Sequence, residues 1–175
     1  MAKNGIVSIA LDFRSGNEDP YPSSVQDINY AVRWAKLNAR ALKTRAELVG
    51  LSGQSSGGHL AMLVAMRPRD ARYLAIPLPG GSSAQDATVG CVLMSWPVIN
   101  PLSRYRHAKR ALAGANPPEW PKSIIPRFVA NYRKAGGEIA LEYIDAERHA
   151  GHSPDLSQTG DMETLPDDCA ARVTS

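Results

Sequence analysis

The stretch "VGLSGQSSGGHLAML", Val49 to Leu63, decides the fold expected for this chain. Within it, Gly53-Gln54-Ser55-Ser56-Gly57 matches the pattern G-x-S-x-G, which holds a serine on a strained turn between a strand and a helix. Glycines two residues to either side of that serine would relieve clashes in the turn. The Ser55 hydroxyl would stand above the end of a sheet, and the backbone N–H of Ser56, at a helix N-terminus, could stabilise an oxyanion. A purely structural glycine-rich turn is the alternative.

The segments around this stretch alternate between strand and helix patterns. Nearly continuous apolar runs predict buried strands at 5–13, 46–52, 88–96 and 138–145. A helix is expected from about Ser24, with Ser24 and Asp27 in capping-box positions. Further helices are expected over 58–66, weakly over 101–112, and from about Pro126 to Gly136. The alternation predicts an α/β domain with a mostly parallel sheet flanked by helices.

Length and composition favour one ordinary globular domain. We assign residues 1–153 of the 175 to that domain and expect 154–175 to form a polar, disordered tail. The net charge of +3 is too small an excess to indicate a nucleic-acid partner, so the basic run at 104–110 is interpreted as a solvated helix face. No stretch approaches a membrane span or a signal peptide, and a cytoplasmic location is expected. Cys91 and Cys169 fit no metal spacing.

A serine nucleophile needs a base, and the chain has four histidines. His59 falls within the helix after the turn, where packing is expected, and His107 lies in the basic segment. His149 and His152 directly follow the last expected strand, at the end of the sheet where α/β proteins place functional residues. We therefore predict His149 as the base, with His152 as the alternative. Surface histidines without a catalytic role are the other interpretation.

Several segments together resemble a known family. "GIVSIALDFR", "YPSSVQDINYAVRW" and "GLSGQSSGGHLA" resemble the hormone-sensitive-lipase-like and acetyl-esterase group (alpha/beta hydrolase fold-3 type) of the α/β-hydrolase superfamily. Its Asp-Tyr-Arg-like strand end, Tyr/Phe-Pro and Val-x-Asp helix start match Asp12–Arg14, Tyr21-Pro22 and Val25–Asp27, and Trp34 occupies the family's tryptophan position. "FVANYRKAGGEIALEYIDAERHAGH" resembles its last helix, strand and histidine. The resemblance implies a carboxylic-ester hydrolase of the esterase/lipase type that acts on a small-molecule ester with neither metal nor organic cofactor. An acyltransferase or a peptidase on the same fold stays open.

The family's pattern is incomplete in this sequence. The HGGG-type oxyanion segment, which in the family precedes the strand aligned with 5–13, is absent, as are the N-terminal strands. The catalytic acid is unidentified, because no acidic residue between Ser55 and His149 follows a recognisable strand in the family's position. The acidic residues in that interval are Asp70, Asp86, Glu119, Glu138, Glu142, Asp145 and Glu147.

The missing parts also affect the sheet. In the family's spatial order, an absent strand lies between those aligned with 5–13 and 47–52, and the acid-bearing strand is expected to be missing as well. Deleting a central strand leaves unpaired backbone groups or makes its neighbours pair anew, so exposed sheet edges would favour self-association. We therefore expect a partial α/β-hydrolase fold with impaired ester hydrolysis, or alternatively a non-catalytic remnant that binds a partner or ligand.

Overall fold

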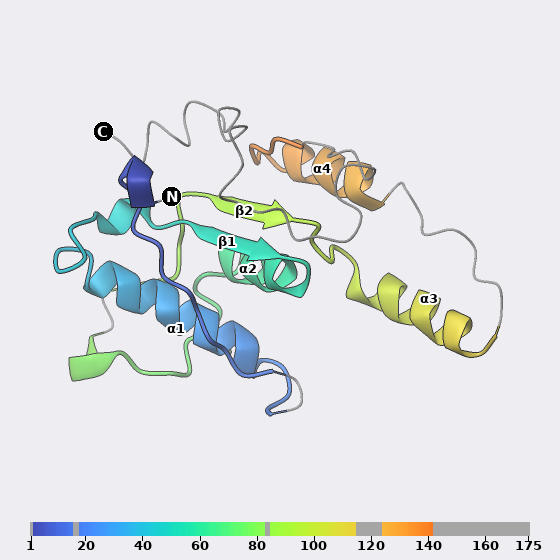
Figure 1. Ribbon diagram of the computed structural model, residues 1–175, viewed down its shortest axis with the longest axis horizontal. Helices are drawn as coiled ribbons and strands as arrows, with labels where there is room; N and C mark the ends of the chain where they lie inside the picture. Colours follow the sequence, from blue (N-terminus) through green and yellow to red (C-terminus); the bar gives the residue numbers. More distant parts are fainter. Residues whose placement is uncertain (1, 16–17, 83–84, 115–123, 142–175) are drawn as a thin grey trace. The chain divides into compact units, whose positions relative to one another are not determined.

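The computed structural model describes residues 2–15, 18–82, 85–114 and 124–141 (Figure 1). The chain divides into two compact units, Met1–Val98 and Ile99–Ser175. The helices and strands of the first unit are α1 (Ser23–Leu37), β1 (Leu51–Gln54), α2 (Ser56–Met66) and β2 (Val92–Ser95). Short 3₁₀ helices occur at Ala2–Asn4 (η1), Ala46–Leu48 (η2) and Pro79–Gly81 (η3). The second unit contains α3 (Pro101–Leu112) and α4 (Ile124–Lys134).

The first unit is built on a β1–α2–β2 crossover. β1 and β2 are parallel neighbours, in a register that pairs Leu51 with Val92 and Gln54 with Ser95. Parallel strands need a crossover connection, and α2, with the loop that follows it, provides one. α2 packs against both strands, and α1 packs against α2 (Figure 1). The predicted α/β class with a parallel sheet is confirmed, with two strands among the residues that the structure describes.

The core of this unit depends on the apolar stripe of α1. Val25, Ile28, Val32 and Ala35 recur at helical spacing, as predicted, and all four are buried. Val25, Ile28 and Val32 pack with residues of β1, α2 and the long loop that precedes β2. The buried core cluster consists of Val25, Ile28, Val32, Leu51, Ala61, Val64, Tyr73 and Ala87.

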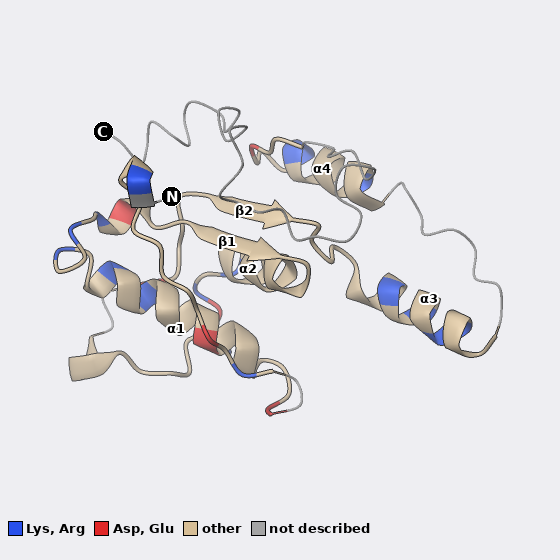
Figure 2. Ribbon diagram, viewed as in Figure 1, with Lys and Arg blue, Asp and Glu red and all other residues tan. Residues whose placement is uncertain are grey.

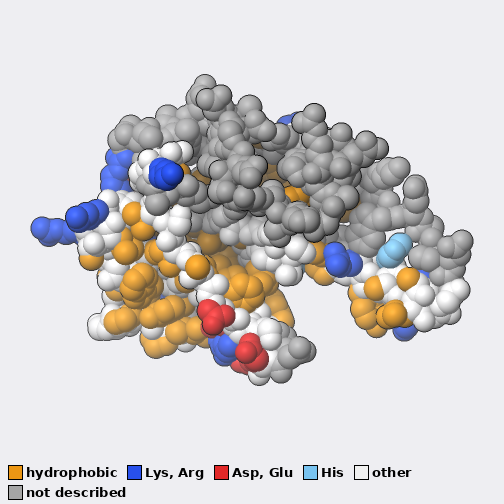
Figure 3. Space-filling view, in the orientation of Figure 1, with side chains coloured by type: hydrophobic (Ala, Val, Ile, Leu, Met, Phe, Trp, Pro, Cys, Tyr) orange, Lys and Arg blue, Asp and Glu red, His pale blue; other side chains and the backbone are white. Residues whose placement is uncertain are grey.

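The strand predicted at 5–13 is not formed. The segment is extended but has no place in the sheet, and Val7, Ile9 and Leu11 are 48%, 44% and 37% exposed. A strand requires a hydrogen-bonded neighbour. None of the described residues pairs with this segment. The segment lies instead along α1, where Ala10–Asp12 and Tyr30, Ala31 and Trp34 contribute to the lining of an open pocket of about 370 Å³. Figure 3 shows hydrophobic side chains gathered over this face.

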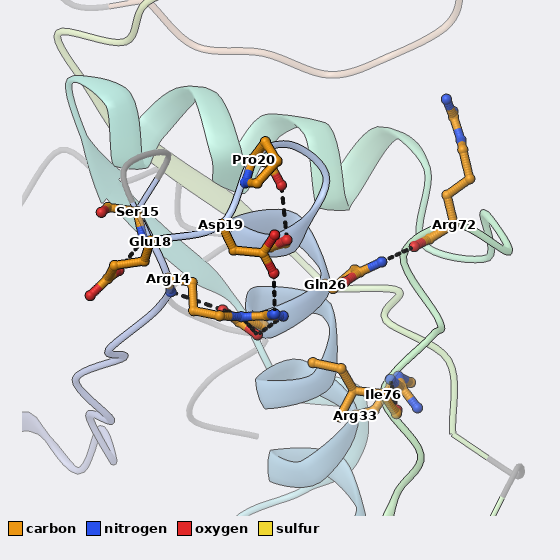
Figure 4. A network of polar contacts seen from close by, with 11 residues as sticks. Arg14, Ser15, Glu18, Asp19, Pro20, Gln26, Arg33, Arg72 and Ile76 are labelled. Carbon is orange, nitrogen blue, oxygen red and sulfur yellow. Dashed lines mark hydrogen bonds and ion pairs between the residues drawn. The ribbon is translucent and has the colours of Figure 1, made fainter.

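The predicted capping box at the start of α1 is also wrong. The helix begins at Ser23, and Asp27 binds Arg14 instead of capping the first turn. Asp27 accepts hydrogen bonds from the Arg14 backbone nitrogen at 2.9 Å and from Nη2 at 2.8 Å. Arg14 Nη1 donates to Asp19 at 2.6 Å (Figure 4). The hydrogen bonds from the Arg14 side chain lower the pKa of Asp27. This cluster fastens the end of the 5–13 segment to α1.

The other predicted strands are shorter than their apolar runs. The run 46–52 forms η2 before β1, and only Val92–Ser95 of 88–96 is in a strand, because each strand extends only as far as its partner pairs with it. Of the last predicted strand, 138–141 is not in a strand, and 142–145 lies outside the described residues. The predicted tail also lies outside them. The helix expected over 58–66 is confirmed as α2.

The two helices of the second unit follow local signals closely. α3 begins at Pro101, as predicted, and its first turn is capped by the Asn100 side chain, which accepts from the Ser103 N–H at 2.9 Å. α4 starts two residues before Pro126, and Gly136 with φ 84° ends it, as predicted. Neither helix contains an acidic residue, and the ribbon of both helices in Figure 2 is blue at Lys and Arg positions and nowhere red. The cations of α3 are exposed, as expected for a solvated face. Within the described parts of the chain, no helix has the length and apolar character needed to cross a membrane.

Candidate active site

The turn between β1 and α2 has the strained backbone that the G-x-S-x-G pattern predicts. Ser55 follows the last residue of β1, precedes the first residue of α2, and has φ 52° and ψ −116°. These angles resemble the first central position of a type II′ turn, which glycine normally occupies. The Ser55 side chain is exposed at the carboxyl end of β1. Exposed strand ends of parallel sheets are where α/β folds place ligand-binding groups.

Hydrogen bonds on both sides hold the backbone of Ser55 in this conformation. Its N–H donates to the carbonyl of Ser95, the last residue of β2, at 2.9 Å. Its carbonyl accepts from the N–H of His59 in α2 and from the N–H of Val98, each at 3.2 Å. A strained conformation persists only where its surroundings fix it in this way.

Of the two glycines that the pattern predicts to avoid clashes, Gly53 is required by close packing and Gly57 is not. A Cβ atom on Gly53 would lie 2.7 Å from the backbone nitrogen of Gly58, so Gly53 must be glycine, as predicted. A Cβ on Gly57 would meet nothing within 4 Å, so the steric reason expected there is wrong. The second close approach is at Gly58, whose Cβ would lie 3.0 Å from the Gly53 carbonyl oxygen. The backbones of β1 and of the first turn of α2 therefore approach each other closely at Gly53 and Gly58.

Ser56 occupies the first position of α2. The N–H groups of a helix's first turn have no acceptor within the helix, and the helix dipole is positive there. The Ser56 N–H, adjacent to Ser55, is suited to bind a negatively charged oxygen.

The histidines are only partly accounted for. His149 and His152 lie outside the described residues, so neither is placed relative to Ser55. His59 is half-buried in α2, and its Nδ1 atom is buried with no hydrogen-bond partner in the described structure. Burial lowers the pKa of His59, and the nearby Val98 backbone acts in the opposite direction. These features agree with the expected packing role of His59. His107 is half-buried in α3, in the other unit.

The acidic residues that precede β2 have cationic partners of their own. Asp70 pairs with Arg72 at 2.6 Å and with Arg67 at 3.6 Å, and the hydrogen bonds from the Arg72 side chain hold the pKa of Asp70 well below its usual range. Asp86 binds Arg69 at 2.7 Å and Lys36 of α1 at 3.2 Å.

Burial alone would raise the pKa of Asp86, but hydrogen bonds from Thr88, Lys36 and Arg69 together lower it. Both carboxylates thus stabilise the loop between α2 and β2. Glu138 is exposed in the second unit, and the remaining acidic candidates lie outside the described residues. Among the described residues, no group of three or more His, Cys, Asp or Glu side chains could hold a metal ion.

The strand, strained turn and helix around Ser55 lie within a segment that a protein-family model matches. The model named BD-FAE matches residues 1–119, more than half of the chain. The chain belongs to the BD-FAE family.

Its relatives include the esterase LipC of Mycobacterium tuberculosis, 29% identical over 90 residues, which are 51% of this chain and 22% of LipC. The hormone-sensitive lipase of Ictidomys tridecemlineatus is 30% identical over 128 residues, which are 68% of this chain and 16% of the lipase. The probable carboxylic ester hydrolase LipM of Mycobacterium tuberculosis is 27% identical over 73 residues, 42% of this chain and 17% of LipM.

These comparisons confirm the resemblance to hormone-sensitive-lipase-like α/β-hydrolases. The matched segments span only about a fifth of each relative's length. The two-stranded parallel sheet and its helices form part of that fold. No solved structure gave a significant match to the chain.

Trp96, a residue beside the turn, was not predicted from the sequence to belong to the site. Trp96 follows β2, has φ 47°, and is 46% exposed. Only the pairing of β2 with β1 places Trp96 beside Ser55. The only feature of the local sequence that marks this position is the Trp96-Pro97 dipeptide after the apolar run.

Proposed function

We propose that the chain carries the nucleophile of a serine hydrolase that acts on carboxylic esters. The observation that carries this proposal is the strained, exposed Ser55, held between β1 and α2 beside the N-terminus of α2. The Ser55 Oγ attacks the ester carbonyl, and the Ser56 N–H donates to the oxyanion that forms. His149, or alternatively His152, takes the proton from Ser55 and returns it to the leaving alcohol. Water then hydrolyses the acyl-enzyme with the same base.

The names of the relatives support the ester class. LipC is an esterase, LipM a probable carboxylic ester hydrolase, and the mammalian relative a lipase. Because this chain spans a small part of each, their shared chemistry is carried over only as a class of reaction. We propose a small-molecule ester as the substrate.

We further propose that the 175-residue chain by itself hydrolyses esters only slowly. Its sequence contains no HGGG-type segment, and losing one oxyanion donor typically costs about 10²–10³ in rate. It also has no acidic residue in the family's position, and losing the acid typically costs about 10⁴. Such losses are not additive, yet either one puts the rate far below that of an ordinary esterase.

Covalent labelling tests the nucleophile separately from turnover. A fluorophosphonate should label Ser55, as located by peptide mass spectrometry, and should not label the Ser55→Ala variant. Ser52→Ala, an exposed serine on β1, is the matched control and should label normally. A lack of labelling at Ser55 in protein that unfolds cooperatively would favour the non-catalytic alternative.

The rate of p-nitrophenyl butyrate hydrolysis tests whether the chain is a slow esterase, as proposed. We expect a weak rate that Ser55→Ala removes, and that His149→Ala lowers more than His152→Ala. Hydrolysis at ordinary esterase rates, abolished by Ser55→Ala, would contradict the proposed impairment.

A further inference from the structure

The last residue of β2 and the segment that follows it form hydrogen bonds with the backbone of Ser55 on both sides. The Ser95 carbonyl accepts the Ser55 N–H at 2.9 Å, and the Val98 N–H donates to the Ser55 carbonyl at 3.2 Å. Pro97 lies against the start of α2, since a Cβ on Gly58 would come within 3.2 Å of the Pro97 Cβ. Trp96 is therefore fixed between two residues that bind Ser55 directly.

Trp96 combines backbone strain with exposure. Its φ of 47° is unfavourable for a bulky side chain, and such outliers concentrate at ligand sites where the surroundings hold them. The side chain is 46% exposed although it is large and apolar. The other large exposed hydrophobic residues of this unit lie elsewhere: on the 5–13 segment, at Tyr21, at the ends of helices, and within β2 at Leu93. Trp96 is thus a large, partly exposed apolar residue at the same carboxyl end of the sheet as Ser55.

The chemistry of this neighbourhood favours a hydrocarbon ligand. The segment Ser95–Val98, which belongs to the same unit as Ser55, contains no charged residue. Adjacent strands lie about 4.8 Å apart, so the first few atoms attached to an ester carbonyl at Ser55 reach the end of β2. An exposed indole there gains stability by covering methylene or aryl carbon.

We propose that Trp96 is a substrate-binding residue that selects esters with a hydrocarbon group on the acyl or the alcohol side. This inference rests on the proposed function, since it places the ester carbonyl at Ser55. Each methylene that Trp96 covers should increase the specificity constant about fourfold, so two covered methylenes give about 15-fold.

Phosphonate reagents test this selection without requiring turnover. Two series of p-nitrophenyl phosphonates are used, each with an ethyl and a hexyl member. In the first series the alkyl group is bonded to phosphorus through carbon and mimics the acyl side of an ester. In the second it is bonded through oxygen and mimics the alcohol side. The second-order rate of labelling at Ser55 is measured by mass spectrometry. The wild type should prefer hexyl over ethyl in at least one series, and Trp96→Ala should reduce that preference by about tenfold. Trp96→Phe should keep most of it, and Leu93→Ala, which truncates an exposed residue of β2 itself, should keep all of it.

A second measurement separates this inference from the proposed hydrolysis. In the Ser55→Ala variant, the indole N–H resonance of Trp96, assigned by its loss in Trp96→Phe, should shift on addition of butyl butyrate. An unchanged hexyl preference in Trp96→Ala would overturn the inference. Labelling of Ser55 in the wild type without a shift of the Trp96 indole resonance would overturn it as well, even if Trp96→Ala fails to fold. A shift without labelling of Ser55 would overturn the hydrolase and leave the hydrocarbon site standing. Neither a shift nor labelling would overturn both.

Discussion

Replacing Ser55 by glycine should stabilise the protein relative to replacing it by alanine. Both substitutions remove the hydroxyl, which makes no hydrogen bond within the described structure. Alanine keeps the Cβ atom that makes φ 52° and ψ −116° unfavourable, whereas glycine adopts these angles freely. The comparison therefore isolates the strain stored at the proposed nucleophile.

The expected magnitude follows from two opposing effects. A residue held in such a sparsely populated region costs on the order of 1–3 kcal/mol, which glycine would recover. Glycine also makes the unfolded chain more flexible, which costs roughly 0.5–1 kcal/mol relative to alanine. The net gain in the free energy of unfolding should be about 1 kcal/mol, or about 4–8 °C in Tm for a unit of this size.

Urea unfolding followed by circular dichroism measures the difference between the two variants. Ser56 provides the matched control because it is the next residue and lies in α2. There glycine should be less stable than alanine, by up to about 1 kcal/mol, since glycine is a poor helix former. If Ser55→Gly proves no more stable than Ser55→Ala while the Ser56 pair behaves normally, the turn does not store strain and the reasoning fails.

The remaining predictions concern packing, ion pairing and association. Gly53→Ala should disrupt the turn severely, because its Cβ would meet the Gly58 backbone, whereas Gly57→Ala should be neutral or stabilise by up to about 1 kcal/mol; equal urea midpoints would contradict this contrast. Asp27→Asn should lower stability at pH 7, and its difference from wild type should disappear as the pH falls below 3.8. Arg14 lowers the pKa of Asp27, so the charged form stabilises the fold above the unfolded-state pKa and is lost as the pH falls through the folded-state pKa. A gap that stays constant between pH 7 and pH 3 would count against that ion pair. Self-association through the exposed 5–13 segment should appear as a mass in light scattering that rises with concentration, and Ile9→Lys should abolish the rise; a constant wild-type mass would exclude it.

Local signals in the sequence predicted the parts of the fold that depend on residues close together in the chain. The apolar spacing of Val25, Ile28 and Val32 predicted the buried face of α1, Pro101 the start of α3, and Gly136 the end of α4. The G-x-S-x-G pattern between apolar runs predicted the order β1, turn and α2. In each case the information lies within one or two helical turns of the residue concerned.

The tertiary structure decided every feature that depends on a distant partner. An apolar run such as 5–13 becomes a strand only when another strand pairs with it, and none among the described residues does. Asp27 has a sequence position suited to capping but binds Arg14, which the chain brings back against α1. Gly58 and Trp96 matter because α2 and β2 come into contact with the backbone of Ser55. The sequence by itself determined which residue stands on the turn. The packing of β2 against β1 determined how that residue is held and what surrounds it, because those contacts join segments about 40 residues apart.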